Sequence, residues 1–244
     1  ILDLDGTTIP NSHDGLPSAP VKLAIKKAQQ KISVSIATSR NLAYCHDVIQ
    51  QLGITSPSVV DGGAQLFDPV TKTIIWEQAI HPADIAVVWS FLKKHNLRFH
   101  YSDGSMNKNL SNTHLPKKAL DFIVYGFTAS QADEFITSLS HIPTLALHKI
   151  TSWTQDELCV KITHASATKL HGVSKIAELL NIHPSTMIGI GDSYNDFPLL
   201  MACGLKVAMG NAVADLKEIA DYVAPSIVDD GLVDVINKFI LNPN

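Results

Sequence analysis

The sequence predicts an α/β protein in which a parallel-sheet core is interrupted by an inserted α+β segment. Two observations carry this prediction. Apolar stretches of strand length alternate with stretches of helical periodicity over residues 1–61 and again from residue 168 onward, a pattern typical of a parallel sheet with helices on its faces. Between these regions the expected strands come in adjacent pairs, which favours an antiparallel sheet. We therefore predict a discontinuous core, residues 1–80 plus 164–244, and an inserted domain over residues 81–163.

The first part of the core is predicted as β-α-β-α-β. Helices are expected where apolar residues recur at helical spacing, the first opened by Pro20 and the second ended by Gly53. The expected order is a strand over 1–5, a helix over 21–30, a strand over 32–37, a helix over 42–52 and a strand over 58–61. The opening strand is short for a buried strand, so we expect a few residues upstream of Ile1.

The inserted segment is predicted as αββαββ and is preceded by a hairpin strand over 74–76. Its expected elements are a helix over 83–95, strands over 98–101 and 121–125, a helix over 129–140, and strands over 144–147 and 158–163. Its phenylalanines at core-facing spacings are Phe91, Phe99, Phe122 and Phe135. The core then resumes with helices over 168–180, 196–202, 215–220 and 232–241, and with strands over 187–191, 206–209 and 222–224.

The composition excludes several classes of protein. Of the 244 residues 45% are hydrophobic and 17% charged, so the chain can bury a core and is not disordered. With a net charge of −4, the chain lacks the excess of basic residues that is typical of a nucleic-acid binder. Three widely spaced cysteines argue against a disulfide framework or a zinc-thiolate site. Since no apolar run approaches the roughly 20 residues of a membrane helix, we expect a soluble cytoplasmic protein, monomeric or homodimeric, with no membrane partner.

Polar clusters follow the predicted parallel strands, whose carboxyl ends usually form the ligand crevice of such a sheet. The first cluster is Asp3 and Asp5, with Gly6 easing the turn. Two carboxylates this close repel each other unless a cation neutralises them, which indicates a hard divalent metal such as Mg²⁺. A turn with two solvated acids is the alternative.

The second and third clusters are less specific. Thr38, Ser39 and Arg40 follow a predicted strand, where hydroxyls and free backbone N–H groups can hold phosphate oxygens. Alternatively, Ser39 only caps the next helix. Lys169 lies near the start of a predicted helix, where its charge opposes the helix dipole. A fixed ammonium there can neutralise a nucleophile and a phosphate, whereas a solvated helix lysine is the alternative.

The fourth cluster is the most specific. An apolar strand runs into Gly191 and Asp192, and Asn195 and Asp196 begin the next helix. Carboxylates at such strand ends can enter a metal shell directly or through water. The glycines do not have the Gly-x-Gly-x-x-Gly spacing of a dinucleotide site, and the chain has no Gly-x-x-x-x-Gly-Lys phosphate loop. An ordinary acidic loop is the alternative.

Taken in this order, the four clusters resemble the motif set of the haloacid dehalogenase (HAD) superfamily. The motifs are Asp-x-Asp-Gly-Thr over 3–7, the strand-end Thr38, Lys169, and Gly-Asp-x-x-Asn-Asp over 191–196. The segments 207–212 and 230–232 are also similar to the Cof-type branch of small phosphatases in this superfamily. The resemblance covers nearly the whole chain, most strongly residues 1–8 and 187–231, and implies a Rossmann-like core with the insert as a mobile cap.

The resemblance implies an Mg²⁺-dependent phosphohydrolase acting on a small phosphomonoester, with sugar phosphates as the family-level expectation. Asp3 would be the nucleophile that forms an aspartyl-phosphate, and Asp5 the general acid and then base. Asp5 would also ligate the metal through its main chain. The implied metal ligands are Asp3, Asp5, Asp192 and Asp196. The implied contacts to the phosphate or substrate are Leu4, Thr38, Ser39, Arg40, Lys169 and Asn195, with Thr38 and Lys169 also counted as catalytic.

The chain departs from the Cof-type pattern at Ser39, where that branch usually has glycine. If this position needs a positive φ, Ser39 strains the loop by about 1 kcal/mol. In the insert, the polar stretch after 101 suggests substrate contacts or a flexible loop. The candidate contacts in and near the insert are His100, Tyr101, Asp103, Lys108, His114 and His164.

Other functions remain open from the sequence. A phosphomutase or phosphotransferase would use the same aspartyl-phosphate with an alcohol in place of water. A dehalogenase is disfavoured because Asp5 and the acidic metal cluster would be superfluous in its metal-free chemistry. A signalling receiver domain also uses acids, a Thr, a Lys and Mg²⁺, but its typical length argues against it. A non-catalytic phosphate-binding protein is the remaining alternative, although every expected catalytic position is filled.

Overall fold

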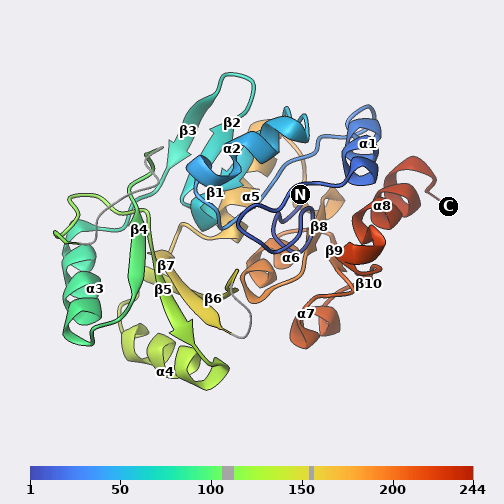
Figure 1. Cartoon of the computed structure of the whole chain (residues 1–244). Coiled ribbons are helices and arrows are strands. Elements are labelled where there is room, and N and C mark those ends of the chain that lie inside the picture. Colours follow the sequence, from blue (N-terminus) through green and yellow to red (C-terminus); the bar gives the residue numbers. More distant parts are fainter. Residues whose placement is uncertain (106–112, 154–156, 244) are drawn as a thin grey trace.

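A parallel sheet built from both ends of the chain forms the centre of the core. A computed structural model describes residues 1–105, 113–153 and 157–243 (Figure 1). Strands β8 (Ile188–Gly191), β9 (Leu205–Ala208) and β10 (Tyr222–Val223) pair in parallel. Parallel bridges continue the sheet from Ile190 to Leu2, from Leu2 to Ile36, and from Ala37 to Val59 of β1 (Ser58–Val60). The N-terminal segment therefore lies between Ile36 and Ile190, which are 154 residues apart in sequence.

The strands expected over 1–5 and 32–37 are reduced to these single bridges, which corrects the sequence prediction. The chain leaves the sheet after Asp3, because Gly6 has a φ of +78° and its N–H donates to the carbonyl of Ile9 in a tight turn. The segment over 32–37 joins the ladder mainly through its last residues, since its neighbour contributes only residues 1–3. Leu2, Leu4 and Ile36 are nevertheless fully or almost fully buried.

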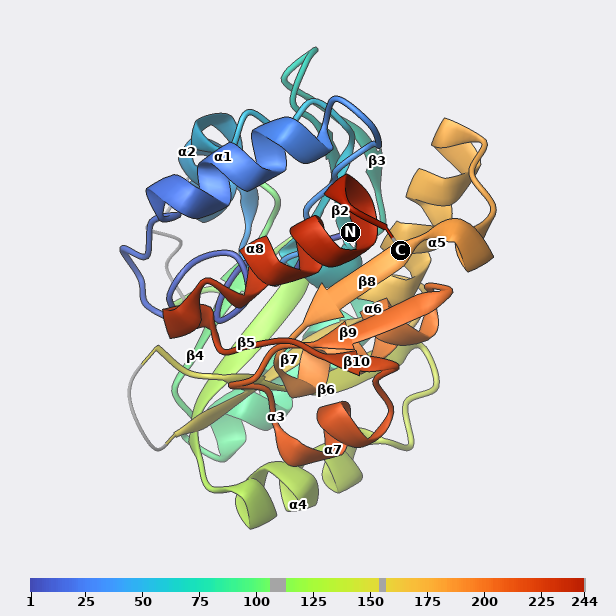
Figure 2. The same ribbon diagram turned by 90° about the vertical axis from the view of Figure 1, so that its right-hand side faces the viewer.

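Helices cover both faces of the parallel sheet (Figure 2). Side chains of α1 (Ala19–Ala28), α2 (Leu42–Gln51) and α8 (Gly231–Ile236) pack in one hydrophobic cluster with Ile36 and Val60. Those of α5 (Lys169–Leu180), α6 (Phe197–Met201) and α7 (Ala214–Glu218) pack in another with Ala37 and Val59. Neighbouring strand residues point to opposite faces, so these two clusters lie on opposite sides of the sheet.

The remaining short elements of the core join these layers. Strands β2 (Gln65–Asp68) and β3 (Thr73–Glu77) extend β1 as an antiparallel hairpin, and of these two the sequence analysis named only β3. Single turns of 3-10 helix lie at Asp61–Gly63, Pro184–Thr186, Tyr194–Asp196 and Ile227–Asp229. The helix expected over 232–241 ends as α8 at Ile236 and continues as a π-helical turn, Asn237–Leu241.

The inserted segment forms an antiparallel sheet with two helices on one face. Its strand order is β4-β5-β7-β6, with the strands β4 (Phe99–Ser102), β5 (Asp121–Phe127), β7 (Leu158–His164) and β6 (Leu145–Thr151). Helices α3 (Pro82–Lys94) and α4 (Ala129–Leu139) lie on its outer face, away from the core (Figure 1). They pack with Phe99, Phe122 and Phe135 in a cluster drawn from residues 80–162, with Phe91 at its edge. The predicted αββαββ order is confirmed.

In the described parts of the chain, each helix is too short or too polar to cross a membrane.

Candidate active site

Three buried aspartates meet at the carboxyl end of the parallel sheet. Asp3 follows the bridge at Leu2, Asp192 follows β8, and Asp196 ends the 3-10 turn beyond it. One carboxylate oxygen from each lies within 4.8 Å of the others. The close approach needs glycine at two points, because a Cβ on Gly6 would overlap the Asp192 carboxylate and one on Gly191 would overlap Asp196. The aspartates of the first and fourth sequence clusters thus lie close together in the folded chain.

Lys169 is buried among these carboxylates. Its Nζ donates to Oδ1 of Asp3 at 2.5 Å and to Oδ1 of Asp196 at 2.6 Å. Burial alone would lower the pKa of Lys169, but the Asp196 and Asp3 carboxylates raise it above its ordinary value, so the ammonium stays charged. The alternative of a solvated helix lysine is therefore wrong.

The charges of this cluster do not balance. Three carboxylates and one ammonium leave two excess negative charges if all are ionised. Burial, followed by the neighbouring Asp196, raises the pKa of Asp3 to about 7, and burial with Asp3 and Asp196 raises that of Asp192 well above its usual range. A hard divalent cation with oxygen ligands fits both the donor atoms and the missing charge.

Asp196 also orders the loop that carries Asp192. Its Oδ2 accepts hydrogen bonds from the backbone N–H groups of Asp192 and Ser193, both at 3.0 Å. Asp192 is held further by the Thr7 hydroxyl at 3.1 Å and by the Asn211 amide at 3.4 Å. The sequence analysis gave no role to Thr7 or Asn211, although both lie within segments that carry the family resemblance.

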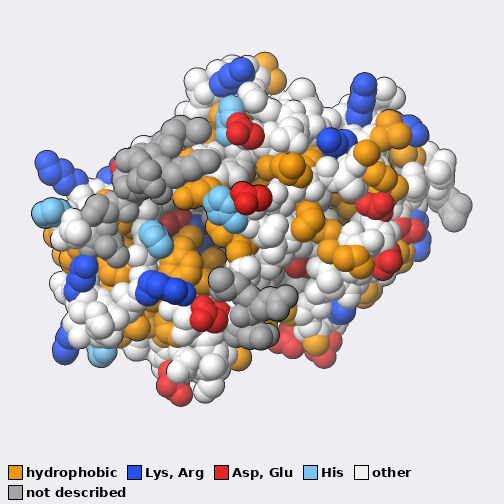
Figure 3. All heavy atoms as spheres, viewed as in Figure 1, with side chains coloured by type: hydrophobic (Ala, Val, Ile, Leu, Met, Phe, Trp, Pro, Cys, Tyr) orange, Lys and Arg blue, Asp and Glu red, His pale blue; other side chains and the backbone are white. Residues whose placement is uncertain are grey.

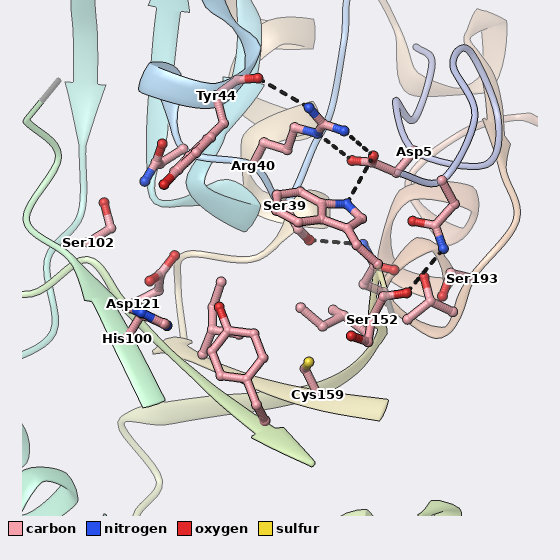
Figure 4. Close-up of a pocket in the computed structure, with 18 of the residues that line it drawn as sticks. Asp5, Ser39, Arg40, Tyr44, His100, Ser102, Asp121, Ser152, Cys159 and Ser193 are labelled. Carbon is pink, nitrogen blue, oxygen red and sulfur yellow. Dashed lines mark hydrogen bonds and ion pairs between the residues drawn. The ribbon is translucent and has the colours of Figure 1, made fainter. Parts of the chain in front are cut away.

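Asp5 is paired with Arg40 rather than grouped with the three aspartates. Arg40 donates from Nη2 to Oδ1 at 2.5 Å and from Nε to Oδ2 at 2.8 Å. Its other three N–H groups donate to the backbone carbonyls of Ser12, His13 and Tyr44, so all five donors of the guanidinium are used. The structure therefore assigns Arg40 to holding Asp5, and not to the phosphate contact expected from sequence. Figure 4 shows the pair at the cavity.

The second sequence cluster forms a short loop beside Asp3. Thr38 is buried, and its hydroxyl accepts a hydrogen bond from the N–H of Arg40 at 3.0 Å. The Asn195 amide donates to the Ser39 hydroxyl at 2.9 Å, which ties the second motif to the fourth. Asn41, not Ser39, is the residue at the N-cap of α2, and Ser39 does not have a positive φ. The expected strain at Ser39 is absent.

Leu4 contributes to this site through its backbone alone. Its side chain is fully buried in the core, and its carbonyl accepts hydrogen bonds from the N–H groups of Thr8 and Ile9 at 2.9 Å each. The main chain between Asp3 and Asp5 is thereby fixed.

A cavity of about 460 Å³ separates this cluster from the inserted sheet. Asp3, Asp5, Ser39 and Asn195 lie on its core side. The inserted sheet supplies the opposite wall, including His100 and Cys159 (Figure 4). Figure 3 shows this face of the molecule, with hydrophobic side chains in orange around the hollow. Lys169, Asp192 and Asp196 lie behind Asp3 rather than on the cavity wall.

Among the described candidate contacts in and near the insert, two line the cavity. These are His100 and Tyr101. The other described candidates make local hydrogen bonds, Asp103 with the N–H of Ser105, His114 with Thr113, and His164 with the N–H of Ser166. Lys108 lies outside the described residues.

A second buried ion pair, not predicted from the sequence, lies within the inserted sheet, and its lysine also reaches the core. Lys161 of β7 donates to the carboxylate of Asp121 on β5 and, at 3.0 Å, to the carbonyl of Ser39. Asp61 adds a further buried carboxylate, and burial, followed by Asp121, raises its pKa to about 7. A lysine at an alternating position of an otherwise apolar strand was the available signal.

The comparisons with known proteins agree with this geometry. The family model of haloacid dehalogenase-like hydrolases matches residues 1–112 and 98–236. The chain is 26% identical over 243 residues to 5-amino-6-(5-phospho-D-ribitylamino)uracil phosphatase YcsE of Bacillus subtilis, covering 98% of this chain and 94% of that protein. It is 24% identical over 266 residues to pyridoxal phosphate phosphatase YbhA of Escherichia coli, covering 98% and 96%.

The fold is shared with solved structures. The HAD subclass IIB sugar phosphatase BT4131 superposes with a TM-score of 0.78 at 21% identity, covering 96% of each chain. The prediction of an α/β fold with a Rossmann-like core and an α+β insert is confirmed by this match.

Proposed function

The chain belongs to the family of haloacid dehalogenase-like hydrolases and is a phosphatase of that family, and from this premise we propose that it hydrolyses a small phosphomonoester through a phosphoryl group held covalently on Asp3. The observation that carries this proposal is the contact of Asp3, which lines the cavity, with the buried Lys169 behind it. A buried carboxylate beside a fixed ammonium is held in one orientation, as a nucleophile must be. The ammonium also partly neutralises the charge of the carboxylate and that of an incoming phosphate.

In the first step, a carboxylate oxygen of Asp3 bonds to phosphorus while the bond from phosphorus to the leaving oxygen breaks. The electron pair stays on that oxygen, which takes a proton from Asp5. In the second step, Asp5 takes a proton from water, whose oxygen attacks phosphorus and releases Asp3. Arg40 donates a hydrogen bond to each Asp5 oxygen, which holds this carboxylate in place at the cavity.

Asp3 and Asp192, with Asp196 beside them and the main chain of Asp5, would hold Mg²⁺. When bound, this ion would neutralise the excess carboxylate charge and the charge that develops on the phosphoryl oxygens. Asp196 has both oxygens engaged by Lys169 and by two backbone N–H groups, so its main role in this proposal is to position Asp192 and Lys169.

The phosphoryl group would be received by groups of three segments next to Asp3. Thr38, Ser39 and Asn195, together with the backbone of Leu4, supply its hydrogen-bonding groups, and Lys169 supplies positive charge. The insert, residues 81–163, would act as a cap that excludes water and contacts the leaving group. The cavity between the two parts supports this role.

The test is phosphate release from sugar phosphates, phosphoglycolate, pyridoxal phosphate and p-nitrophenyl phosphate, with and without Mg²⁺. We expect phosphate release that needs Mg²⁺ and is lost in Asp3→Asn. Release should be retained in Asp47→Asn, which changes an exposed aspartate. Acid quenching during turnover should trap phosphate on the peptide that contains Asp3. Substantial activity of Asp3→Asn, or turnover that a chelator does not affect, would exclude this mechanism.

A further inference from the structure

The leaving-group side of the cavity is walled by aromatic and apolar side chains. We propose that the leaving group of the substrate carries a flat aromatic or heteroaromatic ring, rather than being a bare sugar or a small acid. This inference rests on the proposed phosphatase function and names the class of substrate for the same site.

The wall from the insert is the face of its sheet that the helices leave uncovered. Phe122 and Val124 of β5 point into the cluster beneath α3 and α4, so Ile123 and Tyr125 point the opposite way and line the cavity. Ile150 and Cys159 extend the same wall. Burial raises the pKa of the Cys159 thiol to about 11, so at neutral pH it acts as a small neutral hydrophobic group.

Tyr125 is held in place as a ring. The His100 ring lies edge-on to it, with centroids 5.3 Å apart and an interplanar angle of 89°. The Arg98 guanidinium lies over it, 5.3 Å from the ring centroid. Burial, followed by the Arg98 charge, lowers the pKa of His100, which therefore stays a neutral hydrogen-bonding group at neutral pH.

Two more rings lie beside the proposed acid and base, Tyr44 on the core wall and Trp153 of the insert, which contacts Tyr44 and Arg40. Tyr44 of α2 and Trp153 line the cavity with their centroids 6.3 Å apart at 63°. The Trp153 indole N–H donates to Oδ1 of Asp5 at 3.4 Å, and the Arg40 guanidinium lies 4.9 Å from its ring centroid. Aromatic surface thus begins where the leaving oxygen would meet Asp5, and flat rings pack well against such surfaces.

Within the described part of the cavity, the charged side chains already have partners. Asp3 pairs with Lys169, Asp5 with Arg40, Asp121 with Lys161, and Arg98 with Glu157. Only Arg98 among these cations is well exposed, its side chain being 66% accessible. A second acidic group on the substrate would find little unpaired positive charge near the leaving group, whereas an uncharged ring finds apolar contact on both sides.

The test compares benzyl phosphate with cyclohexylmethyl phosphate, since both release a primary alcohol but only the first carries a flat ring. Ribose 5-phosphate is the sugar reference. We expect kcat/KM to be about tenfold higher for benzyl than for cyclohexylmethyl phosphate. Tyr125→Leu should bring this ratio close to one, and Tyr125→Phe, which keeps the ring, should preserve it. Tyr44→Leu provides the same test from the other wall if Tyr125→Leu does not fold.

Three results would overturn the ring preference while the phosphatase function stands. They are equal kcat/KM for benzyl and cyclohexylmethyl phosphate, a higher kcat/KM for ribose 5-phosphate than for either, and a benzyl-to-cyclohexylmethyl ratio that neither leucine variant changes. By contrast, no phosphate release from any of the three esters, or release that persists in Asp3→Asn, would overturn the proposed function itself. The two failures are therefore distinguishable.

Discussion

The core and the insert face the same cavity with different chemistry. The core side presents buried charged groups, with Lys169 shared between Asp3 and Asp196. The insert side presents mostly rings and apolar groups, such as Tyr125 and Ile150, on one face of an antiparallel sheet. In the proposed function, this difference corresponds to a division of roles in which the core would act on the phosphoryl group and the insert would contact the leaving group.

The two sheet types explain this difference. Carboxyl ends of parallel strands meet at one edge, so short polar loops from distant parts of the chain converge there. An antiparallel sheet with helices on one face leaves its other face free to cover something else. Lys161 is the exception, since it extends from the insert to the Ser39 carbonyl in the core.

The largest expected effect lies in the core. Lys169→Met should lower kcat/KM by about 10³-fold for every phosphate ester, whether or not it carries a ring, because the positive charge beside Asp3 is removed. Steady-state kinetics on benzyl phosphate and ribose 5-phosphate measures this. Lys175→Met, at an exposed lysine of the same helix, is the control. A loss confined to one ester would break the division between core and insert.

The next effect concerns the contact between the two parts. Lys161→Met should lower the free energy of unfolding by about 3 kcal/mol, because it leaves the Asp121 carboxylate buried without its partner. Urea denaturation measures it. Lys149→Met on β6 of the same sheet, which removes a partly exposed pair with Asp133 of α4, should cost less than about 1 kcal/mol. Similar losses of unfolding free energy in the two variants would show that the buried pair stabilises the fold no more than the exposed pair does.

Asp61 makes the same junction sensitive to pH. Its pKa is raised by burial, and then by Asp121, from 3.8 to about 7. The folded state therefore binds an extra proton between these values, and its stability should fall as the pH rises from about 4 to about 7. In Asp61→Asn, the decrease in the free energy of unfolding over this pH range should be smaller than in the wild-type protein by about 1–2 kcal/mol. Asparagine also suits the positive φ of 53° at this position.

Urea denaturation at several pH values, with the exposed Asp47→Asn as control, measures the change in slope. If the wild-type protein and Asp61→Asn lose stability in parallel over this range, the proton is held elsewhere.

The smallest expected effect compares helix caps in the two parts. The Thr128 hydroxyl caps α4 of the insert in a capping box with Gln131, and the Ser18 hydroxyl accepts from Val21 N–H at the start of α1 in the core. Thr128→Ala and Ser18→Ala should each cost about 1 kcal/mol. Hydrogen exchange should show faster opening of the insert alone in the first variant and of the core alone in the second. Faster exchange throughout the molecule in both would show that the two parts unfold together.

The sequence by itself determined the class of fold, most elements and the motif residues. Helical and strand periodicity depend on neighbouring residues, so the αββαββ order and the phenylalanine core of the insert were predictable. The proximity of Asp3, Lys169, Asp192 and Asp196 was also predictable, because strand ends in a parallel sheet share one edge.

The tertiary structure decided which charges pair. Arg40 was expected at the phosphate, but it binds Asp5 with two hydrogen bonds and three carbonyls with its remaining donors. Lys161 meets Asp121 across 40 residues of sequence and Ser39 across 122. Which charged groups pair depends on the distance between segments remote in sequence and on how deeply each group is buried. A local sequence pattern specifies neither quantity. The same reason explains the first strand, whose length in the sheet was set by its neighbours and by the turn at Gly6.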